Sequence, residues 1–145
     1  YFLKEINNVM NQGIKINILG ELKKMPNDLK TILNNTVKKT NKNKKIIVNL
    51  ALNYGSKKEI LIAAKKNSKN LNLQNLSRNL YTKNLPDPDI LIRTGGHQRL
   101  INFMLWQLSY TELFFSKKLW PDFHLKDLKK IIFSYKKIKR NFGGI

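Results

Sequence analysis

Short β-branched runs alternate with helix-length amphipathic segments along this chain, and this alternation limits the possible folds more than any other feature. We expect strands at residues 14–20 (IKINILG), 45–55 (KIIVNLALNYG) and within 85–96 (LPDPDILIRTGG), with helices at 25–40, 56–67 and 124–140. Strands joined by helix-length crossovers favour an α/β fold with a mainly parallel sheet wrapped by helices. The run at 45–55 is apolar enough to predict a strand buried on both faces.

Three further segments carry local predictions. Residues 102–115 (NFMLWQLSYTELFF) read as a buried helix, capped by Asn102, that runs into a short strand. Ser56 is expected to cap the helix at residues 56–67, and Glu59 lies three residues further on, at the capping-box spacing. Residues 1–13 read as a helix without a preceding cap, so we expect the chain to be the C-terminal part of a longer protein whose sheet lacks its opening strands here.

The composition narrows the class of protein. A chain of 145 residues without cysteine is expected to form one domain, residues 1–145, with neither disulfides nor a thiolate metal site. The net charge of +19 could indicate binding to nucleic acid or to an anionic membrane. The basic residues are mostly lysines spread along the chain, so we favour compositional drift that gives a solvated basic surface. No export signal is recognisable, and we expect a cytoplasmic protein.

Two arginines stand out in this lysine-rich chain, because Arg93 and Arg99 flank the Gly95–Gly96 pair. Ligands of parallel α/β sheets bind beyond the carboxyl ends of the strands, where Arg93 is expected to lie. Two guanidinium groups on a glycine turn suit a phosphate group, whose oxygens each can hold in fork geometry. The alternative is that these arginines pair with the nearby carboxylates of Asp87, Asp89, Glu112 and Asp122.

The segment around these arginines resembles a known family. Residues 87–123, from DPDILIRTGG to LWPDF, are similar to the C-terminal signature of cis-prenyltransferases, most closely the bacterial undecaprenyl diphosphate synthases. Residues 49–60 (NLALNYGSKKEI) resemble a second family segment, and residues 140–144 (RNFGG) resemble the family's tail. Together these segments extend over nearly the whole chain.

The resemblance implies an enzyme that condenses isopentenyl diphosphate onto an allylic diphosphate such as farnesyl diphosphate, making cis double bonds. Mg²⁺ is the implied cofactor. The implied assembly is a homodimer that works in the cytoplasm and makes transient contact with the membrane, without nucleic acid. The implied product, undecaprenyl diphosphate, serves cell-wall synthesis.

The resemblance also assigns roles to residues. It implies that Arg93, Arg99, Leu100 and Ile101 contact the diphosphate of isopentenyl diphosphate, and that Glu112 helps hold Mg²⁺. From the residues alone, Glu112 within YTELFF would more simply form a buried salt bridge. The family's aromatic signature positions, which we interpret as structural, are matched by Trp106, Trp120 and Phe123.

The sequence departs from the family pattern at several positions. His97 stands in place of a glutamate, Ile101 in place of a serine hydroxyl, and Asn141 in place of an arginine, while Ser56–Lys57 replaces a Gly-Arg pair. These departures allow two alternatives to an active enzyme: a non-catalytic subunit or a degenerate family member. A basic nucleic-acid-binding module is a third alternative that rests on charge alone.

The family's catalytic aspartate lies in a His-x3-Asp-Gly-Asn-x-Arg motif that these 145 residues do not contain. We therefore assign no catalytic residue to this chain, and we expect residues 1–145 alone to be inactive in prenyl transfer.

Overall fold

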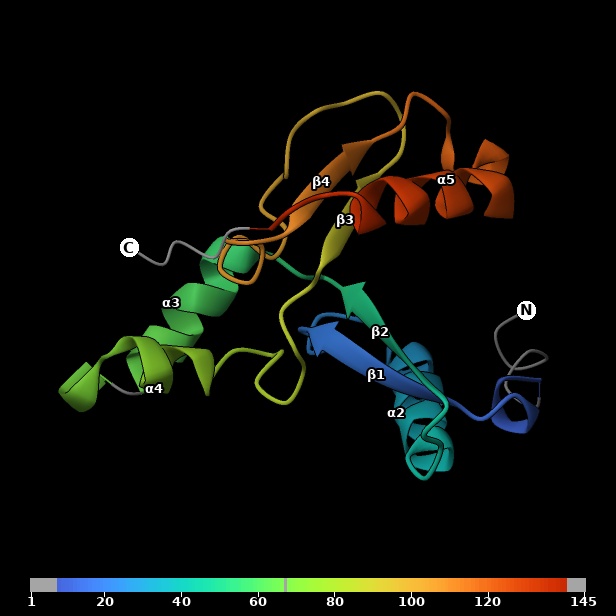
Figure 1. Cartoon of the computed structure of the whole chain (residues 1–145). Helices are drawn as coiled ribbons and strands as arrows, with labels where there is room; N and C mark the ends of the chain where they lie inside the picture. Colours follow the sequence, from blue (N-terminus) through green and yellow to red (C-terminus); the bar gives the residue numbers. More distant parts are fainter. Residues whose placement is uncertain (1–7, 67, 141–145) are drawn as a thin grey trace. The chain divides into compact units, whose positions relative to one another are not determined.

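The computed structural model of the chain describes residues 8–66 and 68–140 and contains two compact units, Tyr1–Lys83 and Asn84–Ile145. Each unit contains one parallel pair of strands (Figure 1). The prediction of an α/β fold with parallel strands is therefore confirmed.

The first unit is built on strands β1 (Ile14–Gly20) and β2 (Ile46–Leu52), which pair in parallel from Ile14–Ile46 to Gly20–Leu52. Helix α2 (Asn27–Thr40) connects them and packs against β1 (Figure 1). A helical segment at residues 8–11 precedes β1. Residues 1–7 of the expected first helix lie outside the described residues.

The contact between α2 and β1 combines apolar and polar groups. Leu33 of α2 and Ile16 of β1 are both buried. Thr40, at the end of α2, is fully buried, and its hydroxyl accepts a hydrogen bond from the Ile16 amide at 3.0 Å while donating to the Thr36 carbonyl at 2.9 Å. The helix end therefore satisfies a buried donor of the strand, which would otherwise carry a desolvation penalty.

The expectation that β2 is buried on both faces is wrong for this unit. Ile46 and Ile47, at its start, are 52% and 47% exposed, and its later residues alternate between exposed and half-buried. In the described residues β2 pairs with β1 alone, and α2 packs against β1. An apolar run predicts that a strand can be covered, but it does not supply the elements that cover it.

The rest of the first unit comprises α3 (Ser56–Lys66), a short 3-10 helix η1 (Ser68–Asn70) and α4 (Leu73–Ser77). Glu59 of α3 is buried, and its carboxylate accepts hydrogen bonds from the Tyr54 hydroxyl and from the Tyr81 amide. α3 begins at Ser56, and the Glu59 carboxylate links α3 to the segment that follows α4. The capping role of Ser56 stays a prediction.

The second unit contains β3 (Ile90–Arg93), β4 (Glu112–Phe115), a 3-10 helix η2 (Trp120–Asp122) and α5 (Leu125–Lys136). The strands pair in parallel from Ile90–Glu112 to Arg93–Phe115. Before α5, the rings of Trp120 and Phe123 stack with an interplanar angle of 8°. None of the described helices is long and apolar enough to cross a membrane.

The helix expected before β4 does not form. Residues 101–110 are a series of turns, and Ile101, Asn102 and Met104 have φ angles of 43°, 55° and 47°. Because a right-handed helix requires negative φ, three left-handed residues within four positions interrupt it before it can start. Only the short strand at the end of that segment, β4, agrees with the prediction.

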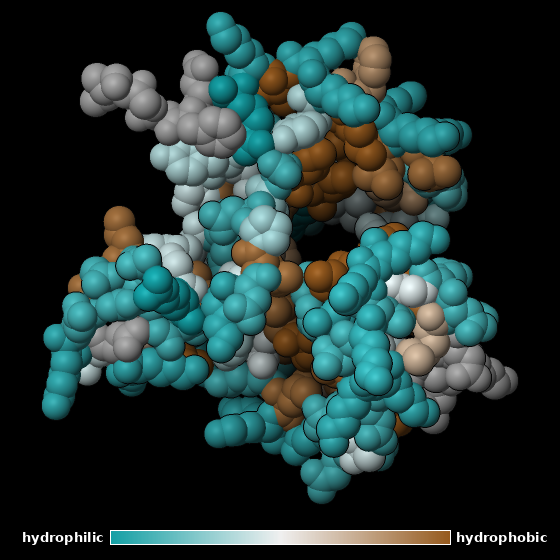
Figure 2. Space-filling model, turned by 60° about the horizontal axis from the view of Figure 1, so that its bottom comes forward, coloured by the Kyte–Doolittle hydropathy of each residue, from teal (hydrophilic) through white to brown (hydrophobic). Residues whose placement is uncertain are grey.

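Hydrophilic residues cover much of the surface seen in Figure 2, and hydrophobic residues gather between them in separate patches. This agrees with lysines distributed over the chain and not confined to one arm.

Candidate functional site

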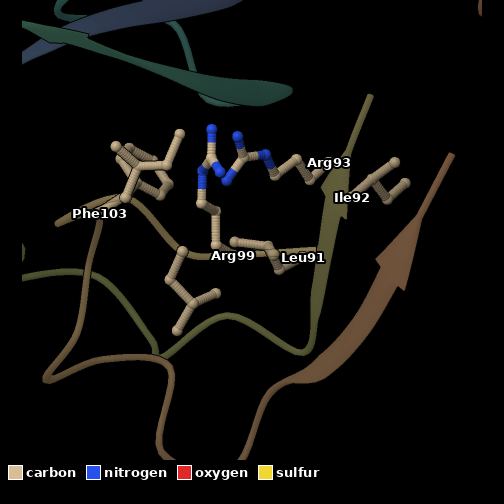
Figure 3. Close-up of a pocket in the computed structure, with 7 residues that line it drawn as sticks. Leu91, Ile92, Arg93, Arg99 and Phe103 are labelled. Atoms are coloured by element: carbon tan, nitrogen blue, oxygen red, sulfur yellow. The ribbon is translucent and has the colours of Figure 1, made fainter. Parts of the chain in front are cut away.

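A cavity of about 260 Å³ lies beside β3 in the second unit. Its walls come from the strand and from the loop that follows it, and its lining residues are Leu91, Ile92, Arg93, Arg99, Leu100, Ile101 and Phe103. All four substrate-binding residues expected from the sequence therefore line one cavity. Figure 3 shows several of the lining side chains.

The two arginines reach the cavity from different elements. Arg93 is the last residue of β3, and Arg99 lies six residues further along the loop. Their guanidinium groups point toward one another (Figure 3). Two positive charges held side by side favour an anionic ligand, since each guanidinium can donate two parallel hydrogen bonds to a phosphate group.

Neither arginine is neutralised within the described residues. The ion pairs of that part of the chain involve neither Arg93 nor Arg99. The Nη1 atom of Arg93 is enclosed and has no hydrogen-bond partner among residues 8–66 and 68–140. Enclosed donors without partners are rare and costly in proteins, so this atom is poised to bond a ligand.

The alternative in which nearby carboxylates pair with these arginines is wrong for the described residues. Of the four carboxylates considered, Asp89 does bind an arginine, but its partner is Arg140 at 2.6 Å. Glu112, which the residues alone suggested as a member of a buried salt bridge, is half-buried and forms no ion pair in the described part of the chain.

The glycine turn between the arginines depends on backbone conformation. Gly95 and Gly96 have φ angles of 87° and 78°, which side chains other than glycine rarely adopt. Their amides donate to the carbonyls of Lys118 and Ser116 at 2.7 and 2.9 Å. The turn is thereby tied to the segment after β4, which fixes the direction in which the loop leaves Arg93.

The loop beyond Arg99 carries strain at the cavity wall. Ile101 is β-branched, has a φ of 43° and is 63% exposed. A left-handed conformation at such a residue is an outlier that persists only when the surroundings enforce it, and such outliers gather at ligand-binding segments. Because a hydrocarbon side chain stands where the family has a serine, the cavity wall at this point offers no hydroxyl.

Sequence reasoning did not identify Leu91, Ile92 and Phe103 as lining residues. The period of two in β3 could have identified Leu91, because it lies two residues before Arg93 and shares its face (Figure 3). No comparable signal existed for Phe103, since the loop has no regular periodicity. The apolar residues give the cavity a hydrocarbon wall beside the two cations.

Glu112 lies away from this cavity. It is the first residue of β4 and pairs with Ile90, whereas Arg93 pairs with Phe115. At about 3.3 Å per residue, Glu112 is roughly 10 Å from the Arg93 end of the strand pair. The described residues contain no group of three His, Cys, Asp or Glu side chains that could hold a metal ion.

The cavity walls therefore do not by themselves fit Mg²⁺, which prefers carboxylate and phosphate oxygens. The role of Glu112 stays a prediction. His97 is exposed in the loop and does not line the cavity. Asn141 and the tail that follows it lie outside the described residues.

The arrangement suits a ligand with an anionic head and a hydrocarbon body. The head would contact the two guanidinium groups, and the body would lie against Leu91, Leu100 and Phe103. A short isoprenoid diphosphate has this chemistry, whereas a nucleotide would also require polar groups for its base and sugar.

Comparison with known proteins agrees with this reading. Residues 1–143 match the prenyltransferase family described as "Putative undecaprenyl diphosphate synthase". Curated isoprenyl transferases from Rickettsia sibirica and Prochlorococcus marinus are 40% and 39% identical over 99% and 98% of this chain. The chain spans 65% and 56% of the lengths of those two relatives.

Solved structures are also similar. The crystal structure of a probable undecaprenyl diphosphate synthase from Campylobacter jejuni matches 99% of this chain and 69% of its own, with a TM-score of 0.89 and 31% identity. That of lavandulyl diphosphate synthase from Lavandula x intermedia, in complex with dimethylallyl diphosphate, matches 99% of this chain and 66% of its own, with a TM-score of 0.91 and 31% identity. The chain belongs to the undecaprenyl diphosphate synthase family of prenyltransferases.

Proposed function

We propose that this chain forms the isopentenyl diphosphate side of a cis-prenyltransferase site. The complete enzyme would condense isopentenyl diphosphate onto an allylic diphosphate such as farnesyl diphosphate, giving undecaprenyl diphosphate for cell-wall synthesis. The observation that carries this proposal is the pair of arginines, Arg93 and Arg99, which converge on one cavity without a carboxylate partner in the described residues.

Family membership supports the proposal, and so does the diphosphate bound to a structural neighbour. The lavandulyl diphosphate synthase structure holds dimethylallyl diphosphate, which has the same five-carbon size and diphosphate head as the ligand proposed here. The apolar wall formed by Leu91, Leu100 and Phe103 supplies a surface for such a hydrocarbon group.

In the proposed reaction these residues bind and orient one substrate. The two guanidinium groups would hold the diphosphate of isopentenyl diphosphate, which stays attached throughout, while the apolar wall directs its double bond toward the allylic partner. Fixing the relative orientation of two reactants removes much of the entropic cost of a bimolecular step. Removal of either arginine should therefore weaken binding and also slow turnover of the complete enzyme.

Isothermal titration of the chain with isopentenyl diphosphate tests this proposal. Arg93→Ala and Arg99→Ala should each lose charge-assisted hydrogen bonds worth about 1.5–3 kcal/mol, which raises Kd by about 10- to 150-fold. Arg78→Ala is the matched control, because Arg78 is an exposed arginine at the end of α4 in the first unit. Lys44→Ala controls for general surface charge.

Equal losses in all four variants would refute a dedicated diphosphate site and would favour diffuse attraction to a basic surface. In that case the affinity for any polyanion, including nucleic acid, should fall steeply with salt. Absence of binding by the unaltered chain would favour the degenerate relative that Ile101 allows.

Other parts of the proposal concern the complete protein. We propose that residues 1–145 are the C-terminal portion of a single domain. They should bind isopentenyl diphosphate but fail to transfer prenyl groups by themselves, because the family's aspartate motif is not among them. Prenyl transfer by these residues in isolation would contradict this proposal.

We further propose a cytoplasmic homodimer in transient contact with the membrane, with Mg²⁺ as cofactor and Glu112 as a residue that contacts it. Sedimentation velocity of the full-length protein tests the dimer, and flotation with anionic vesicles tests the membrane contact. For the metal, Glu112→Gln should reduce the Mg²⁺-dependent part of diphosphate binding, while its Mg²⁺-independent part stays unchanged.

A further inference from the structure

A hydrogen-bonded cluster around Arg140 joins the two ends of the segment that carries the cavity. The Nη1 atom of Arg140 donates to Oδ1 of Asp89 at 2.6 Å, and its Nη2 atom donates to the carbonyl of Tyr110 at 2.9 Å. Asp89 immediately precedes β3, and Tyr110 lies two residues before β4. One guanidinium therefore bonds to both ends of residues 90–109, which include every residue that lines the cavity.

The tyrosine of α5 reinforces this cluster. The Tyr135 hydroxyl accepts a hydrogen bond from Nη1 of Arg140 at 2.8 Å and donates to Oδ1 of Asp89 at 3.2 Å. The Arg140 side chain is 20% exposed, and its hydrogen bond with Asp89 raises the pKa of the guanidinium further above its already high value. The group is thus permanently charged, partly buried and directed at two fixed acceptors.

The arginines of the second unit, Arg93, Arg99 and Arg140, differ in the groups that their side chains contact. The guanidinium of Arg140 bonds to a carboxylate, a main-chain carbonyl and a hydroxyl. In the described residues no carboxylate pairs with Arg93 or Arg99, both of which face the cavity. Arg140 does not line the cavity, so its side chain is not placed to contact a diphosphate bound there, and its hydrogen bonds act instead on the segment that carries the cavity.

That segment needs external support, because it is long and irregular. Eighteen residues, 94–111, connect β3 to β4 without a helix or strand, and five of them, two glycines and three other residues, have positive φ angles. At its base, the Thr111 hydroxyl donates to the Pro88 carbonyl at 2.6 Å and the Glu112 amide donates to the Asp89 carbonyl at 3.0 Å. The contacts of Arg140 add two side-chain bonds at the same base and connect it to the chain that leaves α5.

We propose that Arg140 is a positioning residue for the diphosphate cavity. The Arg140 clamp, defined as Arg140, Asp89, Tyr135 and the Tyr110 carbonyl, fixes the base of residues 90–109 so that Arg93 and Arg99 converge. This inference rests on the proposed function of the cavity, but the conformational effect of the clamp can be measured without a ligand.

Hydrogen exchange of the ligand-free chain tests the clamp itself. Arg140→Lys keeps the charge beside Asp89 but cannot bond to Asp89 and the Tyr110 carbonyl through one planar fork. Tyr135→Phe removes a single hydroxyl. In both variants the amides of residues 95–108 should exchange about tenfold faster, because local opening becomes easier, while amides of the first unit keep their rates.

Arg78→Ala is the matched control, and it should change no amide in residues 95–108. Unchanged exchange in this segment in both clamp variants would overturn the inference, whatever the ligand-binding results are. Arg140→Ala removes the whole side chain, and the two milder variants decide the question if that substitution prevents folding.

A double-mutant cycle with isopentenyl diphosphate tests the link to binding. Arg140→Ala should raise Kd about tenfold in the unaltered chain but less than about twofold in an Arg93→Ala background, because the clamp acts through the arginine that is then absent. If the increases in Kd caused by the two single substitutions multiply in the double variant, Arg140 acts independently of Arg93, and the positioning role is overturned.

The two proposals fail in different ways. If the unaltered chain does not bind isopentenyl diphosphate, the proposed function of the cavity fails, and the exchange rates still decide whether the clamp holds the segment. If the chain binds isopentenyl diphosphate and Arg140→Lys leaves both Kd and the exchange rates unchanged, the clamp fails and the proposed function stands.

Discussion

Arg93 extends into a partly enclosed cavity where Arg99 is also positively charged and no carboxylate pairs with either in the described residues. The ligand-free protein should therefore be less stable than it would be with an apolar side chain at this position. Arg93→Met tests this prediction, because methionine keeps the unbranched hydrocarbon stem and removes the charge and its donors.

The expected change in the free energy of unfolding follows from the enclosed Nη1 atom of Arg93, which has no hydrogen-bond partner in the part of the chain that the structure describes. An unsatisfied buried polar atom costs about 1–3 kcal/mol, and replacing buried charge with an apolar group of similar shape is often stabilising. We therefore expect Arg93→Met to raise the free energy of unfolding by about 1–3 kcal/mol. Arg78→Met, at an exposed site, should stay within about 0.5 kcal/mol of the unaltered chain.

Urea unfolding with and without isopentenyl diphosphate separates stability from function. At a ligand concentration of about 100 times the Kd of the unaltered chain, that chain should gain about 2.7 kcal/mol, whereas Arg93→Met, with a Kd about 10- to 150-fold higher, should gain only about 0.3–1.4 kcal/mol. The difference in the free energy of unfolding between Arg93→Met and the unaltered chain should thus shrink or change sign when ligand is added. A ligand-free Arg93→Met protein that is less stable by 1 kcal/mol or more would refute the reasoning, because it would show that Arg93 supports the fold.

Three other substitutions have expected outcomes. Glu59→Gln should lower the free energy of unfolding by about 1–3 kcal/mol in urea titrations, because an amide cannot accept both hydrogen bonds that the buried carboxylate receives from Tyr54 and Tyr81. Ile101→Ser should lower the Kd for isopentenyl diphosphate by up to about tenfold in calorimetry, since a hydroxyl at the cavity wall can donate to a phosphate oxygen. The pKa of Asp127 is lowered below 3.8, mainly by the hydrogen bond from Lys118 and then by that from the His124 amide. The ionised carboxylate therefore stabilises the start of α5 above that pH. This contribution is lost as the pH falls through the folded-state pKa. Asp127→Asn should remove that acid dependence from circular-dichroism unfolding curves.

Each of these predictions has a control or an outcome that would contradict it. Glu21→Gln alters a half-buried carboxylate paired with the exposed Lys58 and should change stability far less than Glu59→Gln, whose carboxylate is buried. An unchanged Kd in Ile101→Ser would mean that this wall does not face the diphosphate. An identical acid limb with and without Asp127 would exclude its ion pair as a source of the pH dependence.

Sequence patterns were sufficient for most of the regular elements. Period-two and β-branched runs predicted β1 and β3, and amphipathic spacing predicted α2 and α5. These signals work because burial on one face of a strand or helix repeats with the geometry of the element. The same signals predicted a helix before β4, and that prediction was wrong.

The helix predicted in this segment is absent at residues 101–110 for a definite reason. Apolar spacing reports which residues seek burial, but it does not report backbone dihedral angles, and three left-handed residues replace the expected helix. The exposure of β2 has a similar origin: its composition is that of a covered strand, while the described residues supply a neighbour on one side only.

The sequence by itself determined the chemistry of the candidate site, because the types and order of residues already placed two arginines around a glycine pair at the end of a strand. Only the tertiary structure decided that both guanidinium groups face one cavity, that Asp89 pairs with Arg140 and not with either of them, and that Glu112 lies at the opposite end of the strand pair from Arg93. The physical reason is that local sequence sets conformational preferences over a few residues. Which charge meets which partner depends on contacts such as that between Asp89 and Arg140, which are 51 positions apart in the chain.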